Sequence, residues 1–202
     1  MPRTPPRLTT PNQVRIIGGK WRRRLLRFPP AADLRPTPDR VRETLFNWLG
    51  QELPELVTLD LFAGSGALSF EALSRGAARA VAVEVGEQAL AAMRDNASVL
   101  GADGLEVHRA DALAFLRRET RGFDVIFLDP PFREDWMPRL WPLLPGRLNP
   151  GGWLYVEQGQ PVEPPPGWEL FRHQRAGQVH YHLLRRDADS AFAEDLQRKP
   201  TP

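Results

Sequence analysis

The sequence contains no cysteine and only two lysines among its 202 residues. The absence of cysteine excludes a disulfide scaffold, a zinc or iron–sulfur site with Cys ligands, and a cysteine nucleophile. Lys20 and Lys199 lie far apart in the chain, so a site built from several lysines is excluded as well. No apolar run approaches the ~20 residues of a membrane helix, and no apolar segment of a secretory signal is present near the N-terminus. These absences predict a cytoplasmic protein.

The charge is unevenly distributed. Residues 1–50 hold 11 Lys or Arg against 3 Asp or Glu, and the remaining residues hold 16 against 22, although the net charge is only +2. A basic arm on an acidic body indicates contact with a polyanion, most simply a nucleic acid. The alternative is a solvated basic tail with no special purpose.

Four regions are predicted along the chain. Residues 1–12 and 187–202 are expected to be disordered tails, because their composition gives them little apolar surface to bury. Residues 13–50 are expected to form a basic extension. Residues 51–186 are expected to form the main domain, and nothing indicates an obligate oligomer, so we expect a monomer.

The basic extension is predicted to contain two elements. Its residues 13–28 favour a β-hairpin, because β-forming residues flank the turn signal Gly18-Gly19. A helix follows, with Pro38 in its first turn and Thr37 or Asp39 as its N-cap.

The main domain shows alternating strands and helices. This alternation predicts an α/β fold with a mostly parallel, seven-stranded sheet, helices on both faces, and a C-terminal antiparallel hairpin at one edge. Ligands of such sheets bind beyond the carboxyl ends of the strands. The expected strands are 57–62, 80–84, 105–109, 123–128, 152–157, 168–175 and 179–185, and the expected helices are 67–74, 87–100, 112–118 and 138–144.

A glycine-rich turn follows the first strand of this domain. The strand delivers Asp60, and a turn containing Phe62, Gly64 and Gly66 then opens a helix whose free N–H groups face a ligand. In a dinucleotide site, a third Gly or Ala would stand where this sequence has Ser69. Asp60 would also repel a pyrophosphate but attract a cation, so the turn favours S-adenosylmethionine over NAD.

Two further acidic residues stand at strand ends. Glu84 ends the second strand, where a carboxylate can accept the hydroxyls of a ribose. Asp111, followed by Ala112, comes after the third strand, and its carboxylate could accept a proton from an adenine amino group. The alternative is that Glu84 and Asp111 are only helix N-caps.

The fourth strand leads into Asp129-Pro130-Pro131-Phe132. The two prolines fix an extended, rigid turn whose carbonyl groups point outward as acceptors. The Asp129 carboxylate and the Pro130 carbonyl could hold both N–H bonds of a nucleobase amino group, while Phe132 stacks on the base. The alternative is a rigid turn with a capping Asp. His180 and His182 would share one strand face, but no third ligand is evident, so we expect no metal site.

These motifs resemble those of the class I, Rossmann-like S-adenosylmethionine-dependent methyltransferases, and the Asp-Pro-Pro-Phe tetrad resembles their amino-methyltransferase group. Residues 15–19 (RIIGG) and 34–49 (LRPTPDRVRETLFNWL) are similar to the bacterial 16S ribosomal RNA guanine-N2 methyltransferase family of the small subunit. The resemblance covers about residues 13–186. One departure is that Lys20-Trp21-Arg22-Arg23-Arg24 lacks the Gly that the family usually has before its last Arg.

The resemblance implies a role for each matching residue. It implies S-adenosylmethionine as cofactor and 16S ribosomal RNA, within an assembled or partly assembled 30S particle, as partner. The implied catalytic residues are Asp129, Pro130 and Phe132. The implied cofactor-binding residues are Thr37, Asp60, Phe62, Gly64, Gly66, Glu84, Asp111, Ala112 and Asp129. The residues expected to contact RNA are Arg15, Lys20, Arg22, Arg23, Arg24, Arg35 and Arg40, because Arg matches phosphate oxygens.

Two rival functions stay open on the sequence alone. A DNA adenine or cytosine amino-methyltransferase would use the same catalytic loop, but ~40 residues before the core helix leave little room for a target-recognition domain. A non-catalytic RNA-binding assembly factor could retain the fold, although the intact loop at 129–132 argues against it.

Overall fold

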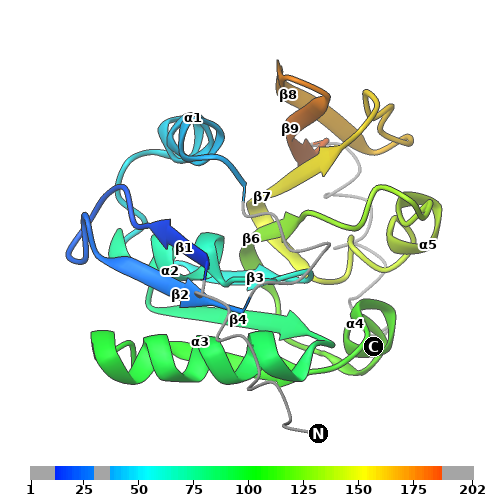
Figure 1. Cartoon of the computed structure of the whole chain (residues 1–202). Coiled ribbons are helices and arrows are strands. Elements are labelled where there is room, and N and C mark those ends of the chain that lie inside the picture. The colour runs from blue at the N-terminus through cyan, green and yellow to red at the C-terminus, as the bar shows by residue number, and fades with distance from the viewer. Residues whose placement is uncertain (1–11, 30–36, 188–202) are drawn as a thin grey trace, which may run out of the picture.

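A seven-stranded sheet with the strand order β5-β4-β3-β6-β7-β9-β8 forms the centre of the molecule (Figure 1). The computed structural model describes residues 12–29 and 37–187. Strands β3 to β7 pair in parallel, whereas β9 pairs antiparallel with both β7 and β8. The predicted sheet is therefore confirmed. Its strands are β3 (Val57–Asp60), β4 (Arg79–Glu84), β5 (Leu105–Arg109), β6 (Phe123–Leu128), β7 (Leu148–Gln158), β8 (Trp168–Ala176) and β9 (Val179–Arg186).

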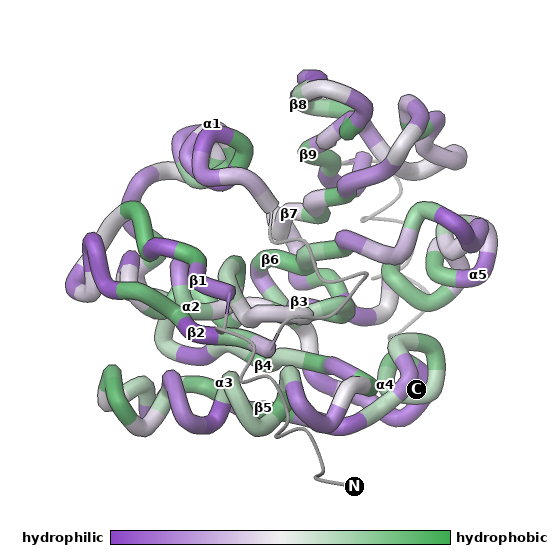
Figure 2. The backbone as a smooth tube through the Cα atoms, in the orientation of Figure 1, coloured by the Kyte–Doolittle hydropathy of each residue, from purple (hydrophilic) through white to green (hydrophobic). Residues whose placement is uncertain are grey.

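Helices cover both faces of this sheet. Along β6, Val125 and Phe127 join one hydrophobic cluster while Ile126 and Leu128 join the other, because successive side chains of a strand point to opposite faces. The tube in Figure 2 accordingly shows the central strands as largely hydrophobic. The first cluster is covered by three helices, α1 (Asp39–Leu49), α2 (Ala67–Ser74) and α3 (Glu87–Leu100), and by the strand pair β1 (Asn12–Arg15) and β2 (Leu25–Phe28). The second cluster is covered by α4 (Ala112–Arg118) and α5 (Met137–Leu140).

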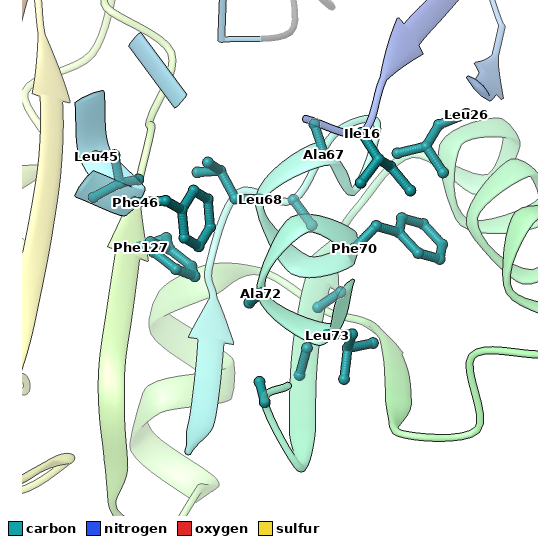
Figure 3. Packing of buried hydrophobic residues seen from close by; sticks show 14 of the residues in the cluster. Ile16, Leu26, Leu45, Phe46, Ala67, Leu68, Phe70, Ala72, Leu73 and Phe127 are labelled. Atoms are coloured by element: carbon teal, nitrogen blue, oxygen red, sulfur yellow. The ribbon is translucent and has the colours of Figure 1, made fainter. Parts of the chain in front are cut away.

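The β1–β2 hairpin is built into the core rather than projecting from it. The two strands pair antiparallel with Val14 opposite Leu26, as the hairpin prediction requires. Figure 3 shows Ile16 and Leu26 beside Phe70 of α2, and both aliphatic side chains are fully buried. Burying a side chain of this size stabilises the fold by ~1.5–3 kcal/mol. The hydrophobic effect therefore fixes the basic extension to the main domain.

A buried ion cluster makes a second connection between the extension and the domain. Arg42 of α1 and Glu71 of α2 are both 0% exposed. Glu71 accepts hydrogen bonds from the backbone N–H groups of Ile17 and Gly18, each at 2.8 Å, and from Arg75 Nε at 2.8 Å. Arg42 contacts Glu71 at 3.5 Å and donates to the Arg15 carbonyl at 2.8 Å. Sequence reasoning missed this cluster.

The start of α1 differs from the prediction. Pro38 precedes the helix, and neither Thr37 nor Asp39 caps it through a side chain. Asp39 is instead the first helical residue, and its carboxylate pairs with Arg15 at 2.8 Å and with Arg42 at 2.6 Å. The capping prediction is wrong because tertiary partners compete for both side chains.

Some element ends also differ. α5 ends at Leu140 rather than Leu144, since Pro142 lacks the N–H that would continue a helix. β3 ends at Asp60 rather than Phe62, and β7 begins at Leu148 rather than Gly152.

Apart from Asn12 and Asp187, the two expected tails lie outside the described residues, as does Arg35. Within the described ranges, no helix has both the length and the apolar character needed to cross a membrane.

Candidate active site

A cleft of about 1810 Å³ opens beyond the carboxyl ends of the parallel strands. Strands β3, β4, β5 and β6 all end at this edge of the sheet. The sheet therefore brings to the cleft the predicted site residues, which are far apart in the sequence. Nearly all predicted cofactor and catalytic residues line it: Thr37, Asp60, Phe62, Gly64, Glu84, Asp111, Ala112, Asp129, Pro130 and Phe132.

The glycine turn after β3 has the backbone that only glycine adopts readily. Gly64 and Gly66 have φ values of 52° and 75°. Gly66 is the N-cap of α2 and does not itself line the cleft. A Cβ placed there would lie 3.0 Å from Met93 and 3.1 Å from Phe70, so Gly66 allows α2 to pack against α3. The turn thus presents the N-terminus of α2 to the cleft.

Asp60 is a buried carboxylate at the base of this turn. Its side chain accepts a hydrogen bond from Ser69 Oγ at 3.0 Å. Burial raises the pKa of Asp60 to about 7, although the Ser69 hydrogen bond opposes the shift. Ser69 stands where a dinucleotide site would have its third Gly or Ala, and its hydroxyl donates to the Asp60 carboxylate. An acidic group here favours a cation over a pyrophosphate.

Glu84 and Asp111 have structural partners as well as a place in the cleft. Glu84 accepts from the N–H of Gly64 at 2.9 Å and from the N–H of Gly86 at 2.7 Å, which holds the carboxylate against the glycine turn. Asp111 caps α4 by accepting from the N–H of Ala114 at 3.0 Å. Asp111 is therefore an N-cap, whereas Glu84 is not, because the N-cap of α3 is Gly86. Each carboxylate keeps lone pairs for a further donor.

The loop after β6 places its acceptor and its aromatic ring on the cleft. Asp129 is partly buried, and Phe132 is 51% exposed, as a ring that stacks on a base must be. The pKa of Asp129 lies well above its ordinary value, first because of burial and then because of the nearby Glu157 carboxylate. The Thr37 hydroxyl opposes both shifts, since it lowers the pKa of Asp129 and of Glu157.

Sequence reasoning missed Glu157 as a residue of this site. It lines the cleft at the end of β7, is 2% exposed, and accepts a hydrogen bond from the Tyr155 hydroxyl at 2.8 Å. Burial raises its pKa. The available signal was a carboxylate that ends the apolar run Leu154-Tyr155-Val156.

Trp136 adds an aromatic wall to the cleft. Its ring packs edge-on against Phe62 at 5.0 Å and lines the cleft. Its buried indole N–H has no hydrogen-bond partner within the described part of the chain. Protein atoms cover this N–H, so it is the Trp136 ring that faces the cleft. The apolar Phe62 and Trp136 rings, the N-terminus of α2 and the buried Asp60 together fit a nucleoside with a cationic group.

Those predicted RNA-contacting residues that the structure describes are exposed and lie outside the cleft. Lys20 lies at the C-terminal end of α2, where its N–H donates to the Ser74 carbonyl at 2.7 Å, and its ammonium stacks on Trp21 at 4.2 Å. The cleft begins at the other end of α2, ~12 Å away by helix rise. Arg15 is engaged with Asp39. The exposed members of the set are Arg15, Lys20, Arg22, Arg23, Arg24 and Arg40.

His180 and His182 share one strand face with His173. The rings of His173 and His182 stack at 4.5 Å, and His173 Nε2 lies 3.0 Å from His180 Nδ1. Burial lowers the pKa of His182 to about 4. Within the described residues, these histidines and the surrounding acids form no group that could hold a metal ion.

Comparison with known proteins identifies the family. The sequence model of a family described as "Conserved hypothetical protein 95" matches residues 14–185. The chain belongs to this family. It is 41% identical over 193 residues to the ribosomal RNA small subunit methyltransferase D of Escherichia coli (strain K12), covering 91% of this chain and 95% of that protein. The corresponding protein of Haemophilus influenzae is 39% identical over 188 residues, covering 88% and 97%.

Solved structures agree with this placement. A putative methyltransferase (yhhF) from Escherichia coli matches with a TM-score of 0.79 at 42% identity, covering 88% of this chain and 99% of that one. The ribosomal protein L11 methylase of Lactobacillus delbrueckii matches with a TM-score of 0.61 at 18% identity, covering 80% and 84%, which shows the Rossmann-like methyltransferase fold alone. The family resemblance and the fold predicted from the sequence are confirmed.

Proposed function

We propose that this protein transfers a methyl group from S-adenosylmethionine to the exocyclic N2 of a guanine in 16S ribosomal RNA, within an assembled or partly assembled 30S particle. The observation that carries the proposal is the rigid loop 129–132, which presents a carboxylate and an exposed Phe132 ring in the same cleft as the glycine turn. The names of the relatives support a ribosomal RNA substrate of the small subunit.

The cofactor would be held by residues already described. The α2 N-terminus and Gly64 would approach its amino-acid part, Glu84 its ribose hydroxyls, and Asp111 with Ala112 its adenine. Asp60 would contribute negative charge near the cationic part. When bound, S-adenosylmethionine supplies an electrophilic methyl group on a sulfonium.

The loop 129–132 would position the base. A guanine N2 is a weak nucleophile because its lone pair is delocalised into the ring. The Asp129 carboxylate and the Pro130 carbonyl would accept its two N–H bonds and stabilise the positive charge that develops on nitrogen. Phe132 would stack on the ring and contribute ~1–3 kcal/mol. Catalysis would therefore rest on placement and electrostatics.

The basic extension would hold the RNA at a distance from the reacting base. The exposed arginines Arg22, Arg23 and Arg24 lie at the far end of α2 from the cleft, so they would contact phosphates of a neighbouring RNA segment. Such contacts position RNA without reading its sequence. Arg15 and Arg40 would extend this surface, and Arg35, which lies outside the described residues, is proposed as an RNA contact from the sequence alone. We propose that the protein acts as a monomer in the cytoplasm.

A methyl-transfer assay with tritium-labelled S-adenosylmethionine tests the proposal. The substrates are 30S particles from a strain that lacks this enzyme, free 16S RNA, and duplex DNA. We expect label in the RNA of 30S particles, and we expect the Asp129→Ala variant to bind particles normally but transfer no methyl group. Label in DNA alone would overturn the substrate. Normal particle binding with no transfer by the unaltered protein would support the non-catalytic assembly factor instead.

A further inference from the structure

Asp129 and Glu157 occupy neighbouring positions on neighbouring strands. In the register of β6 and β7, Leu128 is opposite Val156, so the next residue of each strand is a carboxylate. Side chains at such positions point to the same face, and parallel strands lie only ~4.8 Å apart. Asp129 is partly exposed to the cleft, whereas Glu157 is 2% exposed. Both carboxylates line the cleft, and Asp129 is the more exposed of the two.

Two hydroxyl groups hold this pair. The Tyr155 hydroxyl donates to Glu157 Oε1 at 2.8 Å, and the Thr37 hydroxyl lies beside the two carboxylates and lowers the pKa of each. Thr37 comes from the residues just before α1, so the basic extension supplies part of the arrangement. Tyr155 is itself buried, with its ring against Phe127 at 6.3 Å.

Burial of two acids side by side has a chemical consequence. Two like charges in a poorly solvated place do not ionise independently, so each disfavours the charge of the other. Among the described residues, the carboxylates that raise the pKa of Asp129 are Glu157 and Asp60 on β3. Tyr155 on β7 and Tyr181 on β9 are the titratable groups beside Glu157. An ordinary Asp is a weak base near neutral pH, and its neighbour makes this one stronger.

We propose that Glu157 is a positioning residue for methyl transfer, acting through Asp129, which accepts the proton that the methylated nitrogen gives up. This inference rests on the proposed function. The N2 lone pair would form the bond to the methyl carbon while the bond from that carbon to the donor's sulfur breaks and leaves its electron pair on sulfur. One N2–H bond then breaks and its electron pair stays on nitrogen as the lone pair. The proton forms an O–H bond with Asp129 and then leaves to water in the cleft. Glu157 stays unreacted beside Asp129, and the Thr37 hydroxyl lies next to both carboxylates.

Opposite shifts of a pH profile test the proposal. Glu157→Gln keeps the size of the side chain and an acceptor for Tyr155 but removes the charge. The pKa of Asp129 then falls, so the acidic limb of kcat/KM on 30S particles moves to lower pH. The maximal kcat falls about tenfold or more because the base is weaker. Thr37→Val removes a hydrogen bond that lowers the pKa of Asp129, so its limb moves to higher pH.

Matched variants separate this role from a structural one. Thr37→Ser keeps the hydroxyl and should leave the limb in place, and Glu163→Gln changes an exposed carboxylate and should change nothing. Dissociation constants for S-adenosylmethionine and melting temperatures report whether each variant is folded and binds. An acidic limb that stays at the same pH in Glu157→Gln overturns the proposal, whatever the loss in rate.

A second measurement does not depend on the RNA substrate. Carboxyl 13C NMR of the free protein, with labelled Asp and Glu, follows the ionisation of Asp129 directly. We expect Asp129 to ionise at a lower pH in Glu157→Gln than in the unaltered protein. An unchanged titration would refute the coupling. If the coupling is present but guanine N2 is not methylated, the proposed function fails while the pairing stands.

Discussion

Replacing Glu71 with alanine should detach the basic extension from the domain. The carboxylate accepts from two backbone N–H groups, those of Ile17 and Gly18, and pairs with Arg42 and Arg75. Each N–H left without an acceptor costs ~1–3 kcal/mol, and breaking a buried ion pair costs ~3–5 kcal/mol. Asp39 still pairs with Arg42 at 2.6 Å, so these costs do not add fully. We expect a loss of about 3–5 kcal/mol in the free energy of unfolding.

Urea unfolding followed by circular dichroism measures this loss. In a domain of this size it corresponds to a fall of the melting temperature on the order of 10 °C. Hydrogen exchange gives the local effect, because the amides of Ile17 and Gly18 should lose protection before the central strands do. Glu43→Ala, which changes an exposed carboxylate of α1, is the control and should stay within about 0.5 kcal/mol. A loss below about 1 kcal/mol in Glu71→Ala would refute the reasoning.

Three further predictions concern the hairpin and the buried Asp60. Arg23 has a φ of 71° at the position where the related family usually has a Gly, and this conformation costs a residue with a side chain ~1–2 kcal/mol. Arg23→Gly should therefore raise the midpoint of urea unfolding, and an unchanged midpoint would contradict the strain. The combined Arg22→Ala and Arg23→Ala variant should bind 30S particles more weakly, while its affinity for the cofactor stays the same. The slope of log affinity against log salt concentration should become shallower by about 0.7–0.9 for each phosphate that is no longer neutralised. An unaltered slope would show that these residues do not contact the RNA. Asp60 has a pKa of about 7 in the folded protein and a lower one in the unfolded protein, so its burial lowers the stability of the fold as the pH rises from about 4 through 7. Asp60→Asn should therefore stabilise the fold at pH 8 but not at pH 3.5. An equal gain at both pH values would contradict this cost of burial.

The parts of the fold that depend on local signals could be predicted from the sequence. Helices α2 and α3 begin and end close to glycines, and α4 begins after Asp111. Strands β5 and β6 have the predicted bounds. The parallel sheet could be predicted because alternating strands and helices favour one kind of topology. Most of the cleft residues could be found because they follow strands of that sheet.

The missed features depend on contacts between distant segments. Arg42 and Glu71 have no local pattern that marks a charged residue as buried, and only the docking of the hairpin brings them together. The position of Thr37 before Pro38 and Asp39 is typical of a helix cap, but its hydroxyl interacts with Asp129 and Glu157 instead. Glu157 resembled the polar end of a strand. Its importance appears only when β7 is aligned with β6.

The identity of the methylated nucleoside is the most direct test of the central claim. Particles of the 30S type from a strain lacking the enzyme are treated with the protein and labelled S-adenosylmethionine, and the RNA is digested to nucleosides for mass spectrometry. The arrangement of Asp129, Pro130 and Phe132 predicts label on an exocyclic amino group, and the family resemblance predicts that this group is guanine N2. The label should therefore appear as N2-methylguanosine and disappear with Asp129→Ala. Label on a ring nitrogen, a ring carbon or a ribose hydroxyl would contradict the account, because this loop is built to hold an exocyclic amino group.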